Sequence, residues 1–261
     1  MKYIFFDIDN TLVSHVNGAH IPDETRKAIN LLKSNGHEPA IATGRGSFLS
    51  QLTAKEFGID ILVCSGGAEI FYKGKKIFTK FLNQCVIDDF MKISEKFPEV
   101  SAAADENFLY TNGAFDQARI YFNNQAGYDC VKPLSEMKQA IICYIMLPPD
   151  KITHEYGFFY PQNHNENIKL ELMNNFVEVR PANLTKWHGI EFLINHIGAN
   201  INDVITVGDG PNDVEMLQNA ALGIAVGKSH VKAKNAADFI TNDIDEGGIL
   251  KACYDLNLIN S

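Results

Sequence analysis

The fold is decided by the stretch Tyr3-Ile4-Phe5-Phe6-Asp7-Ile8-Asp9-Asn10-Thr11. Its first four residues are apolar and end at an acidic residue, a pattern typical of a strand buried on both faces of a parallel sheet. Two carboxylates two residues apart point to opposite faces of a regular strand. If the chain leaves strand geometry just after Asp7, both acids converge at the carboxyl edge of the sheet, where open α/β sheets bind ligands. A solvated turn with capping carboxylates is the alternative interpretation.

A second acidic stretch follows another apolar strand, at residues 204–207. It is Gly208-Asp209-Gly210-Pro211-Asn212-Asp213, in which the glycines permit a tight turn and a close approach of the backbone to a ligand. Its acids and its amide carry the hard oxygen ligands that Mg²⁺ prefers. In isolation an ordinary turn has the same composition. Because both acidic stretches end strands of one predicted sheet, we expect a cluster of four carboxylates, which would repel one another without a cation.

Strands and helices alternate at both ends of the chain, which implies an α/β fold with a parallel sheet and right-handed crossovers. The predicted strands lie at residues 3–6, 38–42, 59–64, 204–207, 222–226 and 239–241, with a hairpin at 69–72 and 75–79. The predicted helices lie at residues 23–35, 48–57, 187–196, 212–219 and 248–256. Residues 83–182 are richer in aromatic residues, Asn and loops, and begin with an amphipathic helix that carries Val86, Phe90, Ile93 and Phe97. We interpret this segment as a second α/β unit inserted into the first.

Composition limits the classes of function. The 23 basic and 32 acidic residues give a formal net charge of −9, which argues against nucleic acid as a partner. The five cysteines are scattered and form no CxxC pair, so reduced thiols in a cytosolic protein fit better than a disulfide framework or a structural zinc site. The longest apolar run spans residues 140–147, and the apolar start of the chain is too short for a signal peptide. We therefore expect a cytoplasmic protein with no membrane partner.

Two further stretches carry groups that bind phosphate. Thr43-Gly44-Arg45 follows a predicted strand and combines a hydroxyl, a glycine-exposed backbone and a guanidinium, each of which binds phosphate oxygens. A helix N-cap or a plain turn is an equally good interpretation of this stretch. Lys186 begins the helix after the inserted unit, and a lone lysine is usually solvated surface.

Together these stretches resemble the haloacid dehalogenase-like hydrolases, and most closely the Cof-type phosphatases of subclass IIB, which have a large α/β cap. The motifs that carry the resemblance are Asp7-Ile8-Asp9-Asn10-Thr11, Ala42-Thr43-Gly44-Arg45, Lys186 before a Gly-Ile helix, and Gly208-Asp209-Gly210-Pro211-Asn212-Asp213-Val214-Glu215-Met216-Leu217. The resemblance covers nearly the whole chain. It implies a Rossmann-like catalytic core at residues 1–82 and 183–261 and an inserted α/β cap domain at residues 83–182.

The resemblance implies a role for each matching residue. Asp7 is expected to be the nucleophile and Asp9 the general acid/base, with Thr43 and Lys186 holding and neutralising the phosphate. The expected Mg²⁺ site takes Asp7, the backbone carbonyl of Asp9, Asp209 and Asp213, with Asp213 also supporting the lysine. The expected phosphate and substrate contacts are Thr43, Gly44, Arg45, Lys186 and Asn212.

Three positions depart from the family pattern. Many members have Asn-Gly-Ala where this chain has Gly66-Gly67-Ala68, with Ser65 as a partial replacement for the missing amide. Lys-Gly is replaced by Lys186-Trp187-His188-Gly189, and Gly-Asn-Ala by Gly227-Lys228-Ser229. The aromatic run Phe158-Phe159-Tyr160 is expected to be core of the inserted unit, or else a contact for a ring-shaped substrate. These departures bear on substrate choice rather than on the catalytic set.

The sequence thus predicts a Mg²⁺-dependent phosphatase that hydrolyses small phosphorylated metabolites, such as a sugar phosphate or a phosphorylated cofactor, through an aspartyl-phosphate. A phosphomutase or phosphotransferase on the same fold is one alternative, and a non-catalytic metabolite-binding sensor is another. We expect a monomer or a weak homodimer.

Overall fold

The computed structural model describes residues 1–96, 101–112, 123, 129–145, 168–172 and 177–260. The chain forms two compact units. The first comprises Met1–Arg45, Thr53–Phe78 and Thr185–Ser261, and the second comprises Gly46–Leu52 and Thr79–Leu184. The predicted domain boundaries and their assignment to a catalytic core and a cap stay predictions. The aromatic run Phe158-Phe159-Tyr160 lies outside the described residues.

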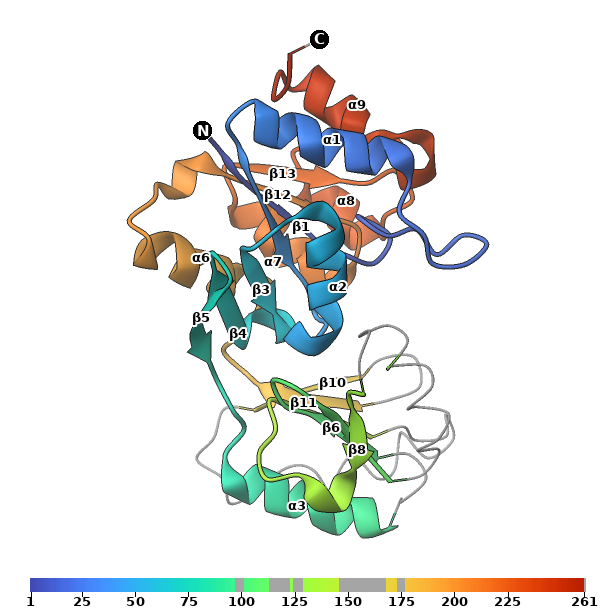
Figure 1. Ribbon diagram of the computed structural model, residues 1–261, viewed down its shortest axis with the longest axis vertical. Helices are drawn as coiled ribbons and strands as arrows, with labels where there is room; N and C mark the ends of the chain where they lie inside the picture. Colours follow the sequence, from blue (N-terminus) through green and yellow to red (C-terminus); the bar gives the residue numbers. More distant parts are fainter. Residues whose placement is uncertain (97–100, 113–122, 124–128, 146–167, 173–176, 261) are drawn as a thin grey trace. The chain divides into compact units, whose positions relative to one another are not determined.

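The first unit is built on an eight-stranded sheet with the strand order β14-β13-β12-β1-β2-β3-β4-β5 (Figure 1). Its strands are β1 (Tyr3–Phe6), β2 (Glu38–Ala42), β3 (Leu62–Cys64), β4 (Glu69–Tyr72), β5 (Lys75–Thr79), β12 (Val204–Gly208), β13 (Leu222–Ala225) and β14 (Phe239–Ile240). Neighbouring strands pair in parallel from β14 to β3, and β4 is antiparallel to β3. Because β1 lies between β12 and β2, the carboxyl ends of these three strands share one edge of the sheet.

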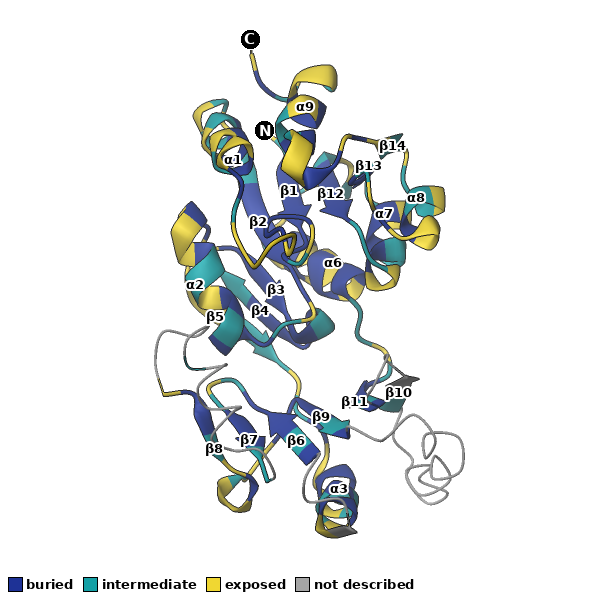
Figure 2. Ribbon diagram, turned by 90° about the vertical axis from the view of Figure 1, so that its right-hand side faces the viewer, coloured by how far each residue is buried: buried dark blue, intermediate teal, exposed yellow. Residues whose placement is uncertain are grey.

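Helices cover both faces of this sheet. They are α1 (Asp23–Ser34), α2 (Ser47–Phe57), α6 (Lys186–His196), α7 (Val214–Asn219), α8 (Val231–Ala236) and α9 (Gly248–Asp255), with short 3-10 turns η1 (Ser65–Gly67), η4 (Ile201–Asp203), η5 (Pro211–Asp213) and η6 (Ile244–Glu246). Ile4 and Phe6 pack with buried residues of α1 and α9, which lie side by side in Figure 1. Tyr3 and Phe5 pack with α6 and α7 on the other face. The alternation along β1 explains why this strand is apolar throughout, and Figure 2 shows β1 and β12 in the colour of buried residues.

The structure confirms the predicted α/β class and parallel sheet, with three local differences. The strand expected at residues 59–64 is shortened to β3, because the backbone N–H of Ile59 instead bonds to Ala54 at the end of α2. The helix expected at residues 212–219 begins as η5 and continues as α7, and the sequence analysis missed α8. The first two differences lie at the end of a strand or helix, where side-chain and turn hydrogen bonds compete with the regular pattern.

The second unit contains a six-stranded sheet with the strand order β10-β11-β9-β6-β7-β8. Its elements are α3 (Gln84–Lys96), β6 (Ser101–Ala104), β7 (Leu109–Thr111), β8 (Val131–Pro133), η2 (Leu134–Glu136), β9 (Ile142–Ile145), β10 (Ile168–Leu172) and β11 (Val177–Pro181). Val86, Phe90 and Ile93 on α3 are buried against the sheet, as their helical spacing predicts. The pairing is antiparallel except between β7 and β8. The inserted segment is therefore α/β in its described part.

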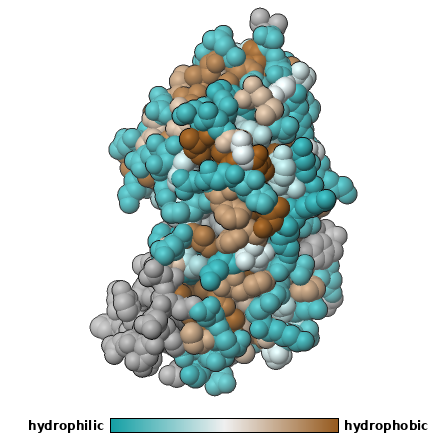
Figure 3. Space-filling view, turned by 90° about the vertical axis from the view of Figure 1, so that its left-hand side faces the viewer, coloured by the Kyte–Doolittle hydropathy of each residue, from teal (hydrophilic) through white to brown (hydrophobic). Residues whose placement is uncertain are grey.

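The surface is mostly hydrophilic with a few apolar patches on the face shown in Figure 3. Among the described residues, Phe192 of α6 is one of the large apolar side chains that stay exposed, and its ring lies 5.0 Å from that of Phe78 on β5. Within the described part of the chain, no helix has the length and apolar character needed to cross a membrane. The expected oligomeric state stays a prediction.

Candidate active site

The edge formed by the carboxyl ends of β12, β1 and β2 collects the predicted residues. Asp7 follows β1, and its backbone N–H bonds to the carbonyl of Val207 at 3.0 Å. The chain then leaves strand geometry, because the backbone N–H groups of Leu12 and Val13 both bond to the carbonyl of Ile8, at 2.9 and 2.8 Å. This tight turn keeps the Asp7-to-Thr11 motif at the edge of the sheet, as the sequence analysis required.

Lys186 joins two of the acids inside the molecule. Its Nζ donates to Asp7 Oδ1 at 2.7 Å and to Asp213 Oδ1 at 2.6 Å. All three side chains are buried, with relative exposures of 2% or less for Lys186 and Asp213 and 7% for Asp7. The residues are far apart in sequence: Asp7 directly follows β1, Lys186 begins α6 and Asp213 ends η5. A buried lysine between two buried carboxylates is a costly arrangement, which suggests a role beyond packing.

Asp213 also organises the acidic turn. Its Oδ2 accepts hydrogen bonds from the backbone N–H groups of Asp209 and Gly210, at 3.0 and 2.9 Å. These two hydrogen bonds cap the start of η5. Gly208 leaves the space for the carboxylate, since a Cβ at this position would lie 2.6 Å from Asp213 Cγ. The motif therefore builds a cradle for Asp213 as well as presenting Asp209.

The three carboxylates of Asp7, Asp209 and Asp213 each place an oxygen within 4.8 Å of the others. The pKa of Asp7 is raised to about 7, chiefly because burial penalises its charge and also because Asp213 is close. Burial and the charge of Asp213 raise the pKa of Asp209 to about 6. The pKa of Lys186 is raised as well, because the attraction of Asp213 and Asp7 outweighs the opposing effect of burial.

When all four groups are ionised, three carboxylates and one ammonium leave two net negative charges. The donor set consists of hard oxygens of the kind that divalent cations prefer, so the residues present fit a divalent metal ion. Both oxygens of Asp213 already accept hydrogen bonds, which leaves Asp7 and Asp209 as the better-placed direct ligands.

Asp9 lies apart from this buried group. Its carboxylate accepts from Arg45 Nε at 2.9 Å and from Arg45 Nη2 at 2.5 Å, and His15 Nε2 lies 2.7 Å from Oδ1. Burial alone would raise the pKa of Asp9, but the hydrogen bonds and charge of Arg45, with help from His15, hold it below its usual value. Three of the four expected carboxylates thus gather, and the expected use of the Asp9 backbone carbonyl as a metal ligand stays a prediction.

The loop after β2 places the remaining predicted groups. The buried Thr43 hydroxyl accepts from the backbone N–H of Arg45 at 3.1 Å. The loop is tied to η1, because Gly66 N bonds to Thr43 O and Ser65 N bonds to Arg45 O. Gly44 lies near the exposed Asn212, whose Nδ2 would be 3.8 Å from a Cβ on the glycine. The structure thus brings the loop after β2 close to the acidic turn after β12.

The departures from the family pattern have structural partners. Ser65 donates to the fully buried carboxylate of Glu69 at 2.6 Å. His188, exposed at the start of α6, lies 2.8 Å from the Thr185 hydroxyl. Lys228 forms an ion pair with Asp243. Trp187 is buried in the core between the sheet and α6.

Comparison with protein families agrees with this geometry. The sequence model of the haloacid dehalogenase-like hydrolase family matches residues 4–253. The chain belongs to this family. We accordingly describe the protein as a hydrolase of phosphatase type, the class in which several of its relatives are placed.

Several relatives of this hydrolase match nearly its whole length. YkrA of Bacillus subtilis is 28% identical over 260 residues, which cover 99% of this chain and 98% of YkrA. The 5-amino-6-(5-phospho-D-ribitylamino)uracil phosphatase YcsE of the same organism is 25% identical, covering 97% of this chain and 94% of its own. The solved structure of the subclass IIB sugar phosphatase BT4131 superposes with a TM-score of 0.81 at 26% identity, over 99% of this chain and 100% of that one. Some other relatives are longer, and the chain spans 46% of one and 55% of another.

Sequence reasoning missed two side chains at the site of this hydrolase. His15, on the loop after the first motif, contacts Asp9, although no motif spacing marks it. The Thr11 hydroxyl donates to Asp209 Oδ1 at 3.4 Å across the two acidic stretches. Thr11 could have been predicted to lie at the site because it belongs to the first motif. The contact of His15 could not, because it depends on how the loop folds back.

Proposed function

We propose that this hydrolase releases inorganic phosphate from small phosphorylated metabolites through an aspartyl-phosphate on Asp7, with Mg²⁺ as its metal. The observation that carries the proposal is the buried group in which the Lys186 ammonium contacts both Asp7 and Asp213, beside Asp209. An unscreened carboxylate repels a phosphate dianion. A nucleophile with a neutralising cation at 2.7 Å, beside a second carboxylate that could share a divalent cation with it, fits attack on that dianion.

Asp7 and Asp209, with the backbone carbonyl of Asp9, would hold the metal. When bound, Mg²⁺ would supply positive charge that neutralises the nucleophile and the phosphate. Asp213 supports the site indirectly, because it orients Lys186 and the backbone of the acidic turn.

The chain's own residues account for the proton and phosphoryl transfers. An Asp7 oxygen forms a bond to phosphorus while the bond from phosphorus to the alcohol oxygen breaks. Lys186 and the Thr43 hydroxyl donate to phosphate oxygens, where charge spreads in the transition state. Asp9 gives a proton to the departing alcohol and then accepts one from the water that hydrolyses the aspartyl-phosphate. A nearby phosphate would raise the pKa of Asp9 and so favour its protonated form before the first transfer.

The substrates we propose are sugar phosphates and phosphorylated cofactor precursors. This class follows the activities of BT4131, a sugar phosphatase, and of YcsE, a phosphatase of a phosphorylated ribitylamino-uracil, which are similar to this hydrolase over nearly its full length. The positions that depart from the family pattern, Gly66, His188 and Lys228, are where we expect its choice among these substrates to differ.

A panel of phosphorylated metabolites tests the proposal. With Mg²⁺ present, we expect free phosphate from at least one sugar phosphate or cofactor precursor, and loss of that activity with EDTA. Adding back Mg²⁺ should restore it, because the two excess negative charges of the site need a divalent cation. The measurement is phosphate release by a colorimetric assay, with product analysis of the same reactions.

The outcomes separate the alternatives. Isomerised sugar phosphate without free phosphate would indicate a mutase. No turnover on the whole panel, together with ligand-induced gains in melting temperature, would indicate a sensor. Full activity in EDTA would contradict the metal assignment.

Metal binding should strengthen as pH rises. Because the pKa values of Asp7 and Asp209 are raised to about 7 and about 6, protons compete with the cation below those values. We expect Mg²⁺ affinity to increase from about pH 5 and to level off above about pH 7.5. Calorimetry in buffers of different ionisation enthalpy should detect the protons released on binding.

The stability of the metal-free protein should decrease as pH rises, in contrast to the metal affinity. A carboxyl whose pKa is raised by folding stabilises the folded state while protonated, and this contribution is lost as pH rises through the raised value.

Asp209→Asn should remove the lower part of the pH dependence of metal binding, while Asp23→Asn, at an exposed site on α1, should leave it unchanged. An affinity independent of pH over this range would contradict the assignment of Asp7 and Asp209 as metal ligands.

A further inference from the structure

The position of the Asp9 carboxylate depends on its hydrogen-bond partners. The side chain of Asp9 is 41% exposed, whereas that of Asp7 is held by burial at 7%. A half-exposed aspartate samples several rotamers unless neighbouring groups restrain it. Arg45 bonds to both of its oxygens from one loop, and His15 bonds to Oδ1 from another.

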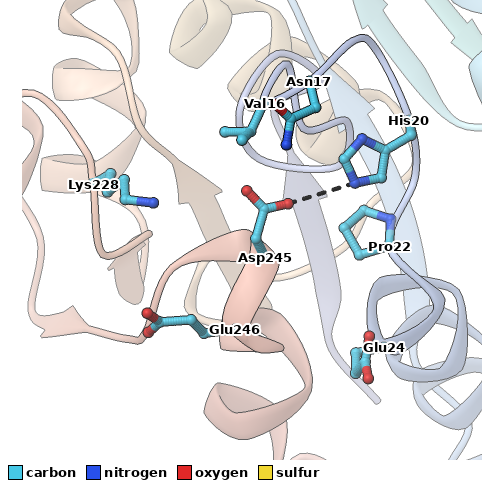
Figure 4. Close-up of a pocket in the computed structure, with 8 residues that line it drawn as sticks. All are labelled: Val16, Asn17, His20, Pro22, Glu24, Lys228, Asp245 and Glu246. Carbon is cyan, nitrogen blue, oxygen red and sulfur yellow. Dashed lines mark ion pairs between the residues drawn. The ribbon is translucent and has the colours of Figure 1, made fainter.

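The loop that carries His15 is itself braced. Ser14 and His20 close it through two backbone hydrogen bonds, of 2.8 and 3.0 Å. The Ser14 hydroxyl then donates to Asp245 Oδ2 at 3.0 Å, and His20 Nε2 lies 3.6 Å from Asp245 Oδ1 (Figure 4). Ser14 is therefore held to η6 by a hydrogen bond, and His20 lies close to the same carboxylate. This places the His15 imidazole at a set position although its side chain is exposed.

The chemistry of the contact fixes its direction. An ionised carboxylate only accepts hydrogen bonds, so His15 Nε2 carries the hydrogen and donates it. With Arg45 Nε on Oδ2 and two donors on Oδ1, both the rotation and the direction of the carboxylate are determined. Proton transfer to a leaving group requires such alignment, and small displacements of a catalytic group lower rates steeply.

We propose that His15, together with Arg45, is a positioning residue that aligns Asp9 for proton transfer. This inference rests on the proposed role of Asp9 as general acid/base. His15 contributes through Asp9 and need not touch the phosphate, so its loss should affect only substrates whose alcohol needs a proton on leaving.

Two phosphate esters distinguish this role. The leaving group of p-nitrophenyl phosphate is a stabilised anion that departs without a proton, whereas an alkyl phosphate taken from the active panel members needs one. The parameter kcat/KM includes every step up to departure of the alcohol. We expect His15→Ala to lower kcat/KM about tenfold or more for the alkyl ester and by less than about threefold for p-nitrophenyl phosphate. The larger loss is a part of the roughly 10²–10⁴-fold that general acid/base catalysis contributes.

Rescue and control variants complete the test. His15→Gln keeps an N–H donor at a similar reach and should recover most of the alkyl-ester activity. His196→Ala removes an exposed histidine on α6 and should change neither ester. The losses of kcat/KM that Asp9→Asn causes with the two esters give the largest difference that loss of the acid can produce.

Each result is decisive. His15→Ala could lower kcat/KM equally for both esters, or for neither, while Asp9→Asn still lowers it more for the alkyl ester. The positioning role would then be wrong, and the proposed function would stand. If Asp9→Asn lowers both equally, the acid role of Asp9 fails and the inference fails with it. A His15→Gln variant as impaired as His15→Ala would also contradict the role of the hydrogen bond.

Discussion

Replacing Asp7 with Asn is expected to abolish turnover without abolishing phosphate binding. The amide cannot form the aspartyl-phosphate, so kcat should fall by roughly four orders of magnitude or more, as when other enzymes lose a catalytic nucleophile. Lys186 and Thr43 remain in place to hold the phosphate. The measurements are kcat on the best substrate of the panel and the dissociation constant of inorganic phosphate from direct binding.

The stability of the Asp7→Asn variant provides a second readout. Because burial and Asp213 raise the pKa of Asp7, its ionised form is unfavourable in the folded protein near neutral pH. Asn removes that charge, so the metal-free variant should melt at a higher temperature than the wild type at about pH 8. Asp23→Asn, on the surface of α1, is the control for a simple change of net charge. Turnover within about tenfold of wild type would show that Asp7 is not the nucleophile.

How far sequence reasoning reached is clearest at the edge of the sheet. Asp7 and Asp209 were placed correctly because parallel strands end at a common edge, so two acidic strand ends must approach each other. Lys186 lies 179 residues from Asp7 and was linked to it only through the family resemblance. A lone lysine at the start of a helix has no local pattern that marks it as buried.

Contacts that depend on loop conformation could not be predicted. The sequence identified Arg45 as a candidate phosphate ligand, but the structure shows its guanidinium on Asp9. His15 reaches Asp9 only because a short loop closes on itself and is braced by Asp245. The start of η5 is likewise capped by one side chain, since Asp213 turns back onto the backbone of Asp209 and Gly210. Patterns of period 2 and 3.6 contain no information on such side-chain choices.

Lys186→Met is expected to have the largest effect on stability. It leaves Asp7 and Asp213 buried without their cation, and breaking a buried ion pair from one side costs about 3–5 kcal/mol. The free energy of unfolding can be measured in urea through the fluorescence of Trp187, the single tryptophan, which is buried in the same helix. Activity should be lost as well, since the ammonium neutralises the nucleophile. Lys251→Met is the matched control, because Lys251 forms an exposed pair with Asp255 worth at most about 1 kcal/mol.

The cost of Lys186→Met should depend on the charge of the two carboxylates, which separates it from a packing defect. In the metal-free variant the loss should shrink as pH falls, because losing Lys186 raises the pKa of Asp7 above its wild-type value and a protonated Asp7 no longer needs a partner. A divalent cation at neutral pH should recover part of the stability by replacing the missing positive charge. Adding Asp213→Asn to Lys186→Met should recover part of it too, since the second change removes one of the unpaired charges. A loss that is the same at every pH, with and without Mg²⁺, would mean that the ammonium acts by filling space and that its charge contributes nothing to holding the acidic group together.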